Sequence, residues 1–121
     1  MAQSDRAQPD STQVTIGSQE GRQAFEIRVN GEDNVAGFTQ FVDVPDTEPA
    51  ERIFPHTLVK DEYAGQGLAS VLVREALDQT IADGKRIIAV CPFVKGWVEK
   101  HPEYAEHVNK TTKAHLDALQ D

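Results

Sequence analysis

The sequence is poor in cysteine and has no long apolar run, and each shortage excludes a class of protein. Cys91 is the only cysteine in 121 residues, so neither an intramolecular disulfide nor a zinc site built from several thiolates can form. No stretch approaches the ~18 consecutive apolar residues of a membrane-spanning helix. We therefore expect a chain with no membrane partner, in which Cys91 is either a small buried residue or a reactive thiol.

Basic residues are also scarce, with 12 Lys and Arg against 20 Asp and Glu and a formal net charge of −8. Such a surface repels a phosphate backbone, so we expect no nucleic-acid partner. It could attract a cationic amine, or it could serve solubility alone. The histidines His101, His107 and His115 are six and eight residues apart, which does not place them on one helical face, so we expect no metal site.

The chain divides into three parts by composition. Residues 1–12 are polar, contain Pro9 and lack apolar periodicity, which predicts a disordered leader. Residues 13–104 predict one domain, and residues 105–121 predict a helical or flexible tail. The first residues also lack the basic and apolar stretches of a secretory signal, so we expect a cytoplasmic protein.

The first half of the domain has the alternating apolar pattern of strands. Residues 13–19 predict a short edge strand, and residues 23–30 and 35–44 predict a hairpin joined by the turn sequence GEDN. Residues 52–59 predict a third strand. Pro55 within it cannot donate a ladder hydrogen bond, which indicates an edge, a bulge or a local distortion.

The second half has the pattern of a strand–helix–strand crossover. Apolar residues from 66 to 83 fall on one helical face, and Gly84 is suited to end that helix. Residues 86–93 form a continuous apolar run, typical of a central strand covered on both faces. The strands before and after the helix should therefore be parallel. A second short helix is predicted from the spacing of Val94, Trp97, Val98 and His101.

Two glycines, Gly65 and Gly67, lie between the third predicted strand and the first predicted helix. A glycine-rich turn before a helix exposes unpaired backbone N–H groups at the positive end of the helix dipole. It can therefore bind an anion such as a pyrophosphate, and side chains at these positions would obstruct the approach. A glycine-containing helix entry without a ligand is the alternative.

The order of these elements, with the sequences HTLVKDEYAGQGLASVLVREAL, VCPFV and WVEKHPEY, resembles the GNAT superfamily of acetyl-CoA-dependent N-acetyltransferases. It is most similar to a small, minimal GNAT-like subfamily, over residues 23–104. The resemblance implies an α/β (α+β) fold. Its mixed sheet would consist of antiparallel N-terminal strands and a parallel strand–helix–strand crossover, and a C-terminal helix would follow. It also implies acetyl-CoA as cofactor and an amine acceptor, on a small molecule or on a protein lysine or N-terminus.

The superfamily pattern Gln/Arg-x-x-Gly-x-Gly/Ala is matched here by Gly67 and Ala69, while Ala64 departs from its first position. A side-chain anchor of the phosphates is therefore missing. The residues that the resemblance assigns to the cofactor are Leu58, Val59, Gly65, Gln66, Gly67, Leu68, Ala69 and Ser70.

The resemblance also suggests catalytic residues. Val98 occupies the position of the tyrosine that many relatives use as a general acid, so that acid is absent. The minimal subfamily has a cysteine at Cys91 and a histidine at His56, and an imidazole can take the proton of a thiol. Cys91 could accept the acetyl group, protonate the leaving thiolate or only pack. The competing hypotheses are a coenzyme A binding module without turnover and an interaction protein on the same scaffold.

Overall fold

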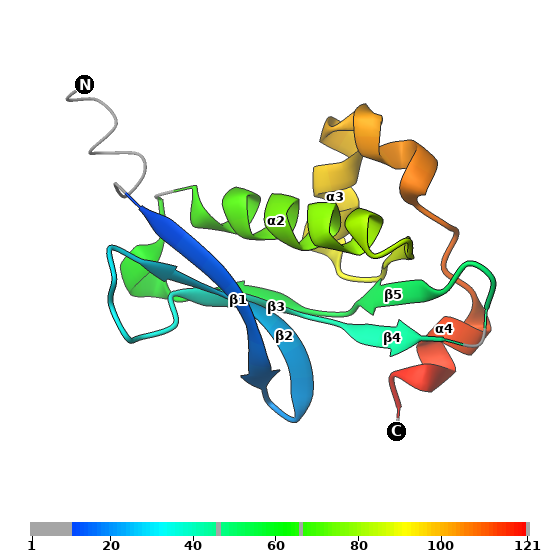
Figure 1. Cartoon of the computed structure of the whole chain (residues 1–121), viewed down its shortest axis with the longest axis horizontal. Coiled ribbons are helices and arrows are strands. Elements are labelled where there is room, and N and C mark those ends of the chain that lie inside the picture. The colour runs from blue at the N-terminus through cyan, green and yellow to red at the C-terminus, as the bar shows by residue number, and fades with distance from the viewer. Residues whose placement is uncertain (1–10, 46, 66, 121) are drawn as a thin grey trace.

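The computed structural model describes residues 11–45, 47–65 and 67–120, and it has two β-sheets with helices on both faces (Figure 1). The first sheet has the order β1-β2-β3-β6, and the second has the order β4-β5-β7. The strands are β1 (Thr12–Gln19), β2 (Arg22–Val29), β3 (Gly37–Gln40), β4 (Val42–Val44), β5 (Glu51–Phe54), β6 (Thr57–Val59) and β7 (Arg86–Ala89). The helices are η1 (Asp61–Tyr63), α2 (Leu68–Ala82), α3 (Pro92–Lys100), η2 (Pro102–His107) and α4 (Lys113–Ala118).

The antiparallel N-terminal strands are confirmed, although β1 spans eight residues rather than forming a short strand. The single strand predicted over residues 35–44 is wrong, because the chain changes sheets at Phe41. β3 pairs with β2, whereas β4 pairs with β5 in the second sheet. The Phe41 ring is buried, and its centroid lies 4.9 Å from that of Phe25.

The strand predicted over residues 52–59 also divides, at Pro55 and His56. β5 pairs in parallel with β7, and β6 pairs antiparallel with β3. Pro55 has no N–H for a ladder, so the local distortion expected from this proline separates the two strands. As a result β6 ends one sheet and β7 ends the other, and within the described residues no strand pairs with the outer edge of β6.

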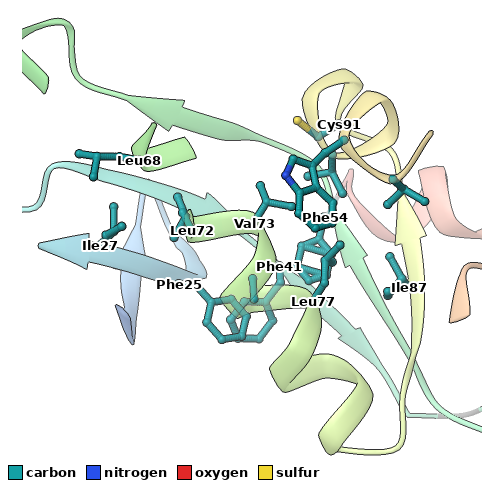
Figure 2. Close-up of a cluster of buried hydrophobic side chains, with 14 of the residues drawn as sticks. Phe25, Ile27, Phe41, Phe54, Leu68, Leu72, Val73, Leu77, Ile87 and Cys91 are labelled. Atoms are coloured by element: carbon teal, nitrogen blue, oxygen red, sulfur yellow. The ribbon is translucent and has the colours of Figure 1, made fainter. Parts of the chain in front are cut away.

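Helix α2 covers one face of both sheets, and its apolar side forms the centre of the core (Figure 2). It spans 68–82 rather than the predicted 66–83; Gln66 lies outside the described residues, and Asp83 is the C-cap. Gly84 follows with φ +75°, the left-handed conformation that commonly ends a helix. The predicted parallel pairing of residues 52–59 with residues 86–93 is confirmed for β5, which pairs with β7, whereas β6, the strand directly before α2, pairs with β3.

The prediction of a central strand over residues 86–93 is wrong in its length and its place. β7 ends at Ala89 and lies at the edge of its sheet, and α3 already begins at Pro92. Proline suits the first turn of a helix because its missing N–H would have no partner there. Ile87 and Ile88 are both fully buried, which explains the apolar run. Among the described strands β7 pairs with β5, and on its other edge Val108 forms an isolated bridge to Ile87.

The C-terminal segment folds back on the face opposite α2, where α4 packs beside β5 (Figure 1). Nε2 of His115 lies 2.7 Å from a carboxylate oxygen of Glu51, and Asn109 donates to the other oxygen at 3.0 Å. The Thr112 amide donates to Nδ1 of His115, so Nε2 carries the proton and donates to Glu51. Nothing in the sequence pattern indicated this anchor.

Replacing Glu51 by glutamine is expected to lower the free energy of unfolding by about 1–3 kcal/mol, since one of two buried donors then faces an amide NH₂. Urea unfolding measures the change. Glu103→Gln, at an exposed position of η2, is the matched control and should change little. An equal loss in both variants would contradict the anchor.

The same anchor predicts a pH dependence. Burial alone would raise the pKa of Glu51, but hydrogen bonds from His115 and Asn109 outweigh it and leave the pKa lowered. A lowered folded-state pKa gives stability that is present above the ordinary glutamate value of about 4.3 and is lost as the pH falls through the folded value. The Glu51→Gln variant should lack this part of the acid destabilisation.

Candidate functional site

The glycine turn between β6 and α2 has the backbone that the two glycines permit. Gly65 and Gly67 have φ values of +83° and +73°, which residues with a Cβ adopt at a cost. The preceding 3-10 helix is held in place by the hydroxyl of Tyr63, which donates to Glu32 at 2.7 Å. The hydrogen bond to Glu32 raises the pKa of Tyr63. The turn is therefore tied to the loop between β2 and β3.

Helix α2 begins without a side-chain cap. Its N-cap is Gly67, and its first turn contains no acidic residue. In most helices a Ser, Thr, Asp or Asn side chain accepts from these first amides. Within the described residues, the amides of Leu68, Ala69 and Ser70 are therefore available to an external acceptor, at the positive end of a 15-residue helix.

A groove of about 370 Å³ lies over this helix start. Six of the eight predicted cofactor residues line it: Val59, Gly65, Gly67, Leu68, Ala69 and Ser70. Gln66 lies outside the described residues. The Leu58 side chain is exposed and does not line the groove, because neighbouring residues of a strand point to opposite faces. Tyr63, Ala64 and Phe93 complete the lining.

The backbone of β6 adds hydrogen-bonding groups beside this groove. Gln40 donates to the carbonyl of His56, and Lys60 donates to the carbonyl of Ala36. Along an antiparallel ladder, every second residue of a strand bonds toward the same neighbouring strand. Leu58, which lies between His56 and Lys60, therefore bonds to β3, whereas Thr57 and Val59 direct their N–H and C=O groups outward. These groups form an open strand edge beside the glycine turn.

Cys91 is the N-cap of α3 and is only 4% exposed. Its amide donates to the carbonyl of Phe54 at 2.8 Å, which brings it beside the end of β5. Its Sγ donates to Oγ1 of Thr57 at 3.5 Å, and Thr57 in turn bonds to Thr39 at 2.9 Å. Figure 2 shows Cys91 at the α3 side of the buried cluster. The thiol thus contacts the strand with the open edge.

His56 is not brought to Cys91 by any hydrogen bond of the described residues. It is exposed, and its ring lies 5.9 Å from that of Phe38. Thr57, the next residue along the extended chain, directs its hydroxyl toward Cys91. Successive side chains of a strand alternate between faces, so the His56 ring points away from the thiol. Thr57 is the partner that the sequence did not indicate.

A second groove, also of about 370 Å³, runs along α3. Its lining residues are Ser70, Pro92, Phe93, Gly96, Trp97, Lys100 and His101. The indole N–H of Trp97 donates to Oγ of Ser70 at 2.9 Å, which joins α3 to the first turn of α2. Ser70 and Phe93 line both grooves, so the two are neighbours.

Metal sites and membrane-spanning helices are absent from the described ranges. No group of three His, Cys, Asp or Glu residues there could hold a metal ion. None of the helices found there has both the length and the apolar character needed to cross a bilayer.

Comparison with known proteins gives a consistent family. A family model described as GCN5-related N-acetyl-transferase matches residues 24–108. Protein NATD1 of Gallus gallus is 29% identical over 92 residues, covering 72% of this chain and 77% of that protein. Protein NATD1 of Danio rerio is 25% identical over 101 residues, with coverage of 81% and 87%.

Two solved structures share the fold. A GCN5-like protein from Staphylococcus aureus superposes with a TM-score of 0.54 at 25% identity, covering 84% of this chain and 93% of that chain. A ribosomal-protein-alanine N-acetyltransferase from Brucella melitensis biovar Abortus 2308 gives a TM-score of 0.52 at 22% identity, covering 78% of this chain and 66% of that chain.

Proposed function

The chain belongs to the GCN5-related N-acetyltransferase family, and from this premise we propose that it transfers the acetyl group of acetyl-CoA to an amine. One observation carries the proposal for this chain. The start of α2 has neither a capping side chain nor an acidic residue, and the described lining of its groove contains no Asp or Glu. In a chain with 20 acidic residues, this arrangement suits a polyanionic cofactor.

The residues present fit that cofactor in two places. The amides of Leu68, Ala69 and Ser70, approached past Gly65 and Gly67, would donate hydrogen bonds to the pyrophosphate. The outward N–H and C=O groups of Thr57 and Val59 would pair with the amides of the pantetheine arm as an added strand does. Leu58, which the sequence also suggested, would then contribute through its place in β6 rather than through its side chain.

When bound, acetyl-CoA supplies an acetyl group activated as a thioester. Cys91 holds a proton at Sγ, at the start of α3 and against Thr57 of the open strand. We propose that this proton is given to the departing sulfur as the amine nitrogen bonds to the acetyl carbon and the carbon–sulfur bond breaks. The proton that the amine nitrogen loses would then restore the Cys91 thiol. The alternative from the sequence, an acetylated Cys91 activated by His56, is less favoured, because the thiol is buried and no base of the described residues bonds to it.

The proposed acceptor is a primary amine of a small molecule or of a protein lysine or N-terminus. The net charge of −8 would favour the approach of a cationic amine. We assign the activity to residues 13–104, and we propose a cytoplasmic location for it. The ribosomal-protein-alanine N-acetyltransferase from Brucella shares the fold, which leaves protein N-termini among the candidate acceptors.

A coenzyme A binding module without turnover is the second candidate. It is favoured by Val98, an 8% exposed apolar residue at the position of the usual acid, and by the burial of Cys91. This candidate predicts tight cofactor binding without release of free coenzyme A from any amine.

Calorimetric titration with acetyl-CoA tests the cofactor site. Gly67→Ala should weaken binding about tenfold or more, because a Cβ enters the turn that must approach the pyrophosphate. Gly84→Ala is the matched control, since Gly84 lies at the other end of α2 with a similar φ of +75°. Both variants should lose a similar stability, and only the first should lose affinity. Absence of binding by the wild type would contradict the proposal.

A further inference from the structure

We propose that β1 is a docking surface for a second copy of this chain. Two copies pair antiparallel through their β1 edges, and their two four-stranded sheets become one continuous sheet. β1, the blue strand of Figure 1, ends its sheet, and no described strand lies on its outer side. The proposal is independent of the acetyltransferase activity. β6, which is proposed to receive the cofactor, is at the opposite end of the same sheet, so both edges can be occupied at once.

The first argument is the set of hydrogen-bonding groups along the free edge of β1. The amide of Asn30 donates to the carbonyl of Ser11 at 3.0 Å, directly before the ladder that pairs β1 with β2. Every second residue of an antiparallel strand bonds toward the same neighbour, so the odd-numbered residues of β1 bond to β2. The even-numbered residues therefore direct their N–H and C=O groups away from β2, at positions 12, 14, 16 and 18.

The second argument is that β1 is complementary to itself. When an antiparallel pair uses all four of these positions, residue 12 lies opposite residue 18 of the second copy, and residue 14 lies opposite residue 16. Ile16 then packs against Val14 of the second copy, and Val14 against its Ile16. Both side chains lie on the α2 face of the sheet, since their partners in β2 are core residues. Thr15 lies opposite Thr15 of the second copy on the other face. Cross-strand pairs of this kind stabilise antiparallel strands.

Ile16 lacks such a cover in the single chain. Its side chain is 55% exposed, the largest value among the exposed large apolar residues of the described ranges. It borders a hollow of about 370 Å³ beside β1, which is lined by Val14, Thr15, Ile16, Phe25, Glu75 and Gln79. A second β1 strand would lie along the outer side of this hollow and bury part of the Ile16 side chain.

The third argument is charge. Residues 11–19, with the sequence STQVTIGSQ, contain no charged side chain, although the whole chain has 20 acidic and 12 basic residues. Two copies with a net charge of −8 repel each other, so they associate most readily where both surfaces are uncharged. Edge strands that remain unpaired are commonly protected by lysine, proline or a bulge. β1 has none of these, and its ladder to β2 is continuous over eight residue pairs.

Residues 1–10 of the same chain are a poorer occupant of this edge. Their sequence, MAQSDRAQPD, contains three charged residues and a proline, and it has no β-branched or aromatic residue to cover Ile16. Pairing between two β1 strands is closed by a twofold axis, because each copy contributes its one free β1 edge. The expected assembly is therefore a dimer. An interface built on one strand pair is small, so the Kd should be about micromolar or higher.

Sedimentation equilibrium of the full chain, from about 1 to about 300 µM, tests the proposal. Wild type should change reversibly from monomer to dimer over this range. Ile16→Lys should weaken the association about 30-fold or more, because two apolar pairs are lost per dimer and like charges are added. Leu116→Lys is the matched control and should not change the association, since Leu116 is also exposed, at 46%, but lies on α4. Urea unfolding should show that both variants remain folded.

A charge exchange at Thr15 tests the register. Thr15→Lys alone and Thr15→Glu alone should each weaken the association about fivefold, because like charges then face each other across the twofold axis. An equimolar mixture of the two variants should associate more tightly than either variant alone. Only the mixed dimer places the opposite charges together.

Each outcome bears on the pairing of β1 strands. A wild type that stays monomeric at every concentration would overturn the proposal, and so would a dimer that Ile16→Lys and Leu116→Lys weaken equally. A mixture of the Thr15 variants that associates no better than each variant alone would show that the two β1 strands do not meet in this register. Acetyl-CoA binding by the monomer is expected in every case, so failure of the dimer leaves the proposed function intact.

Discussion

Replacing Ala69 by aspartate is expected to abolish measurable acetyl-CoA binding while leaving the protein as stable as before or slightly more stable. Ala69 lies in the first turn of α2 and lines the first groove. A carboxylate there interacts favourably with the positive end of the helix and adds about 0.3–1 kcal/mol to the free energy of unfolding. The same charge faces the proposed pyrophosphate, so affinity should fall about 100-fold or more.

The opposite signs of these two effects make the variant informative. A variant that loses binding through misfolding would lose stability as well, and urea unfolding separates the two cases. Ala69→Asn is the matched control, with a side chain of similar size and no charge, and it should retain most of the affinity. Tight acetyl-CoA binding by Ala69→Asp would show that the pyrophosphate does not lie at this helix start.

Replacing Cys91 by alanine is expected to lower the turnover number about 100-fold or more, because a proton donor to the leaving sulfur is removed. Affinity for acetyl-CoA should stay within about twofold, since the thiol is not part of the proposed phosphate cradle. Release of free coenzyme A with a panel of amines measures turnover. Intact mass of the wild type mixed with acetyl-CoA should show no acetylated protein.

His56→Gln is the control for the alternative pairing, and it should reduce turnover about twofold at most. A gain of one acetyl group on the wild type that is lost in Cys91→Ala would instead establish a covalent role for the thiol. Unchanged turnover in Cys91→Ala would leave this residue a packing role only.

The elements with a clear period were predicted from the sequence, and the places where the chain changes sheets were not. Helix α2 buries one regular face, and strand β2 places its large apolar residues Phe25, Ile27 and Val29 at alternate positions, so both elements carry their pattern in the sequence. The breaks at Phe41 and at Pro55 depend on which strands meet in three dimensions. Pro55 indicated a distortion, but only the pairing of β5 with β7 and of β6 with β3 reveals that it divides two sheets.

The candidate site was predicted to a similar extent. The glycine turn and helix start are contiguous in sequence, so six of the eight residues expected to bind the cofactor line one groove. Whether Cys91 and His56 lie close together depends on the direction of the chain and on the face to which each side chain points. A shift of one residue along a strand moves a side chain to the opposite face. Pro92 could have indicated the start of α3, since proline is common in the first turn of a helix.

The anchor between Glu51 and His115 was beyond the reach of the sequence, because it joins residues 64 positions apart. A lone histidine in a polar tail carries no periodic signal.

The most direct test of the acetyl-CoA site is an amide map by ¹H–¹⁵N NMR, recorded with and without acetyl-CoA. We predict saturable changes that are largest at the amides of residues 67–70, with further changes at Thr57 and Val59 of the open strand edge. Spectra that do not change, or changes centred away from the start of α2, would contradict the account.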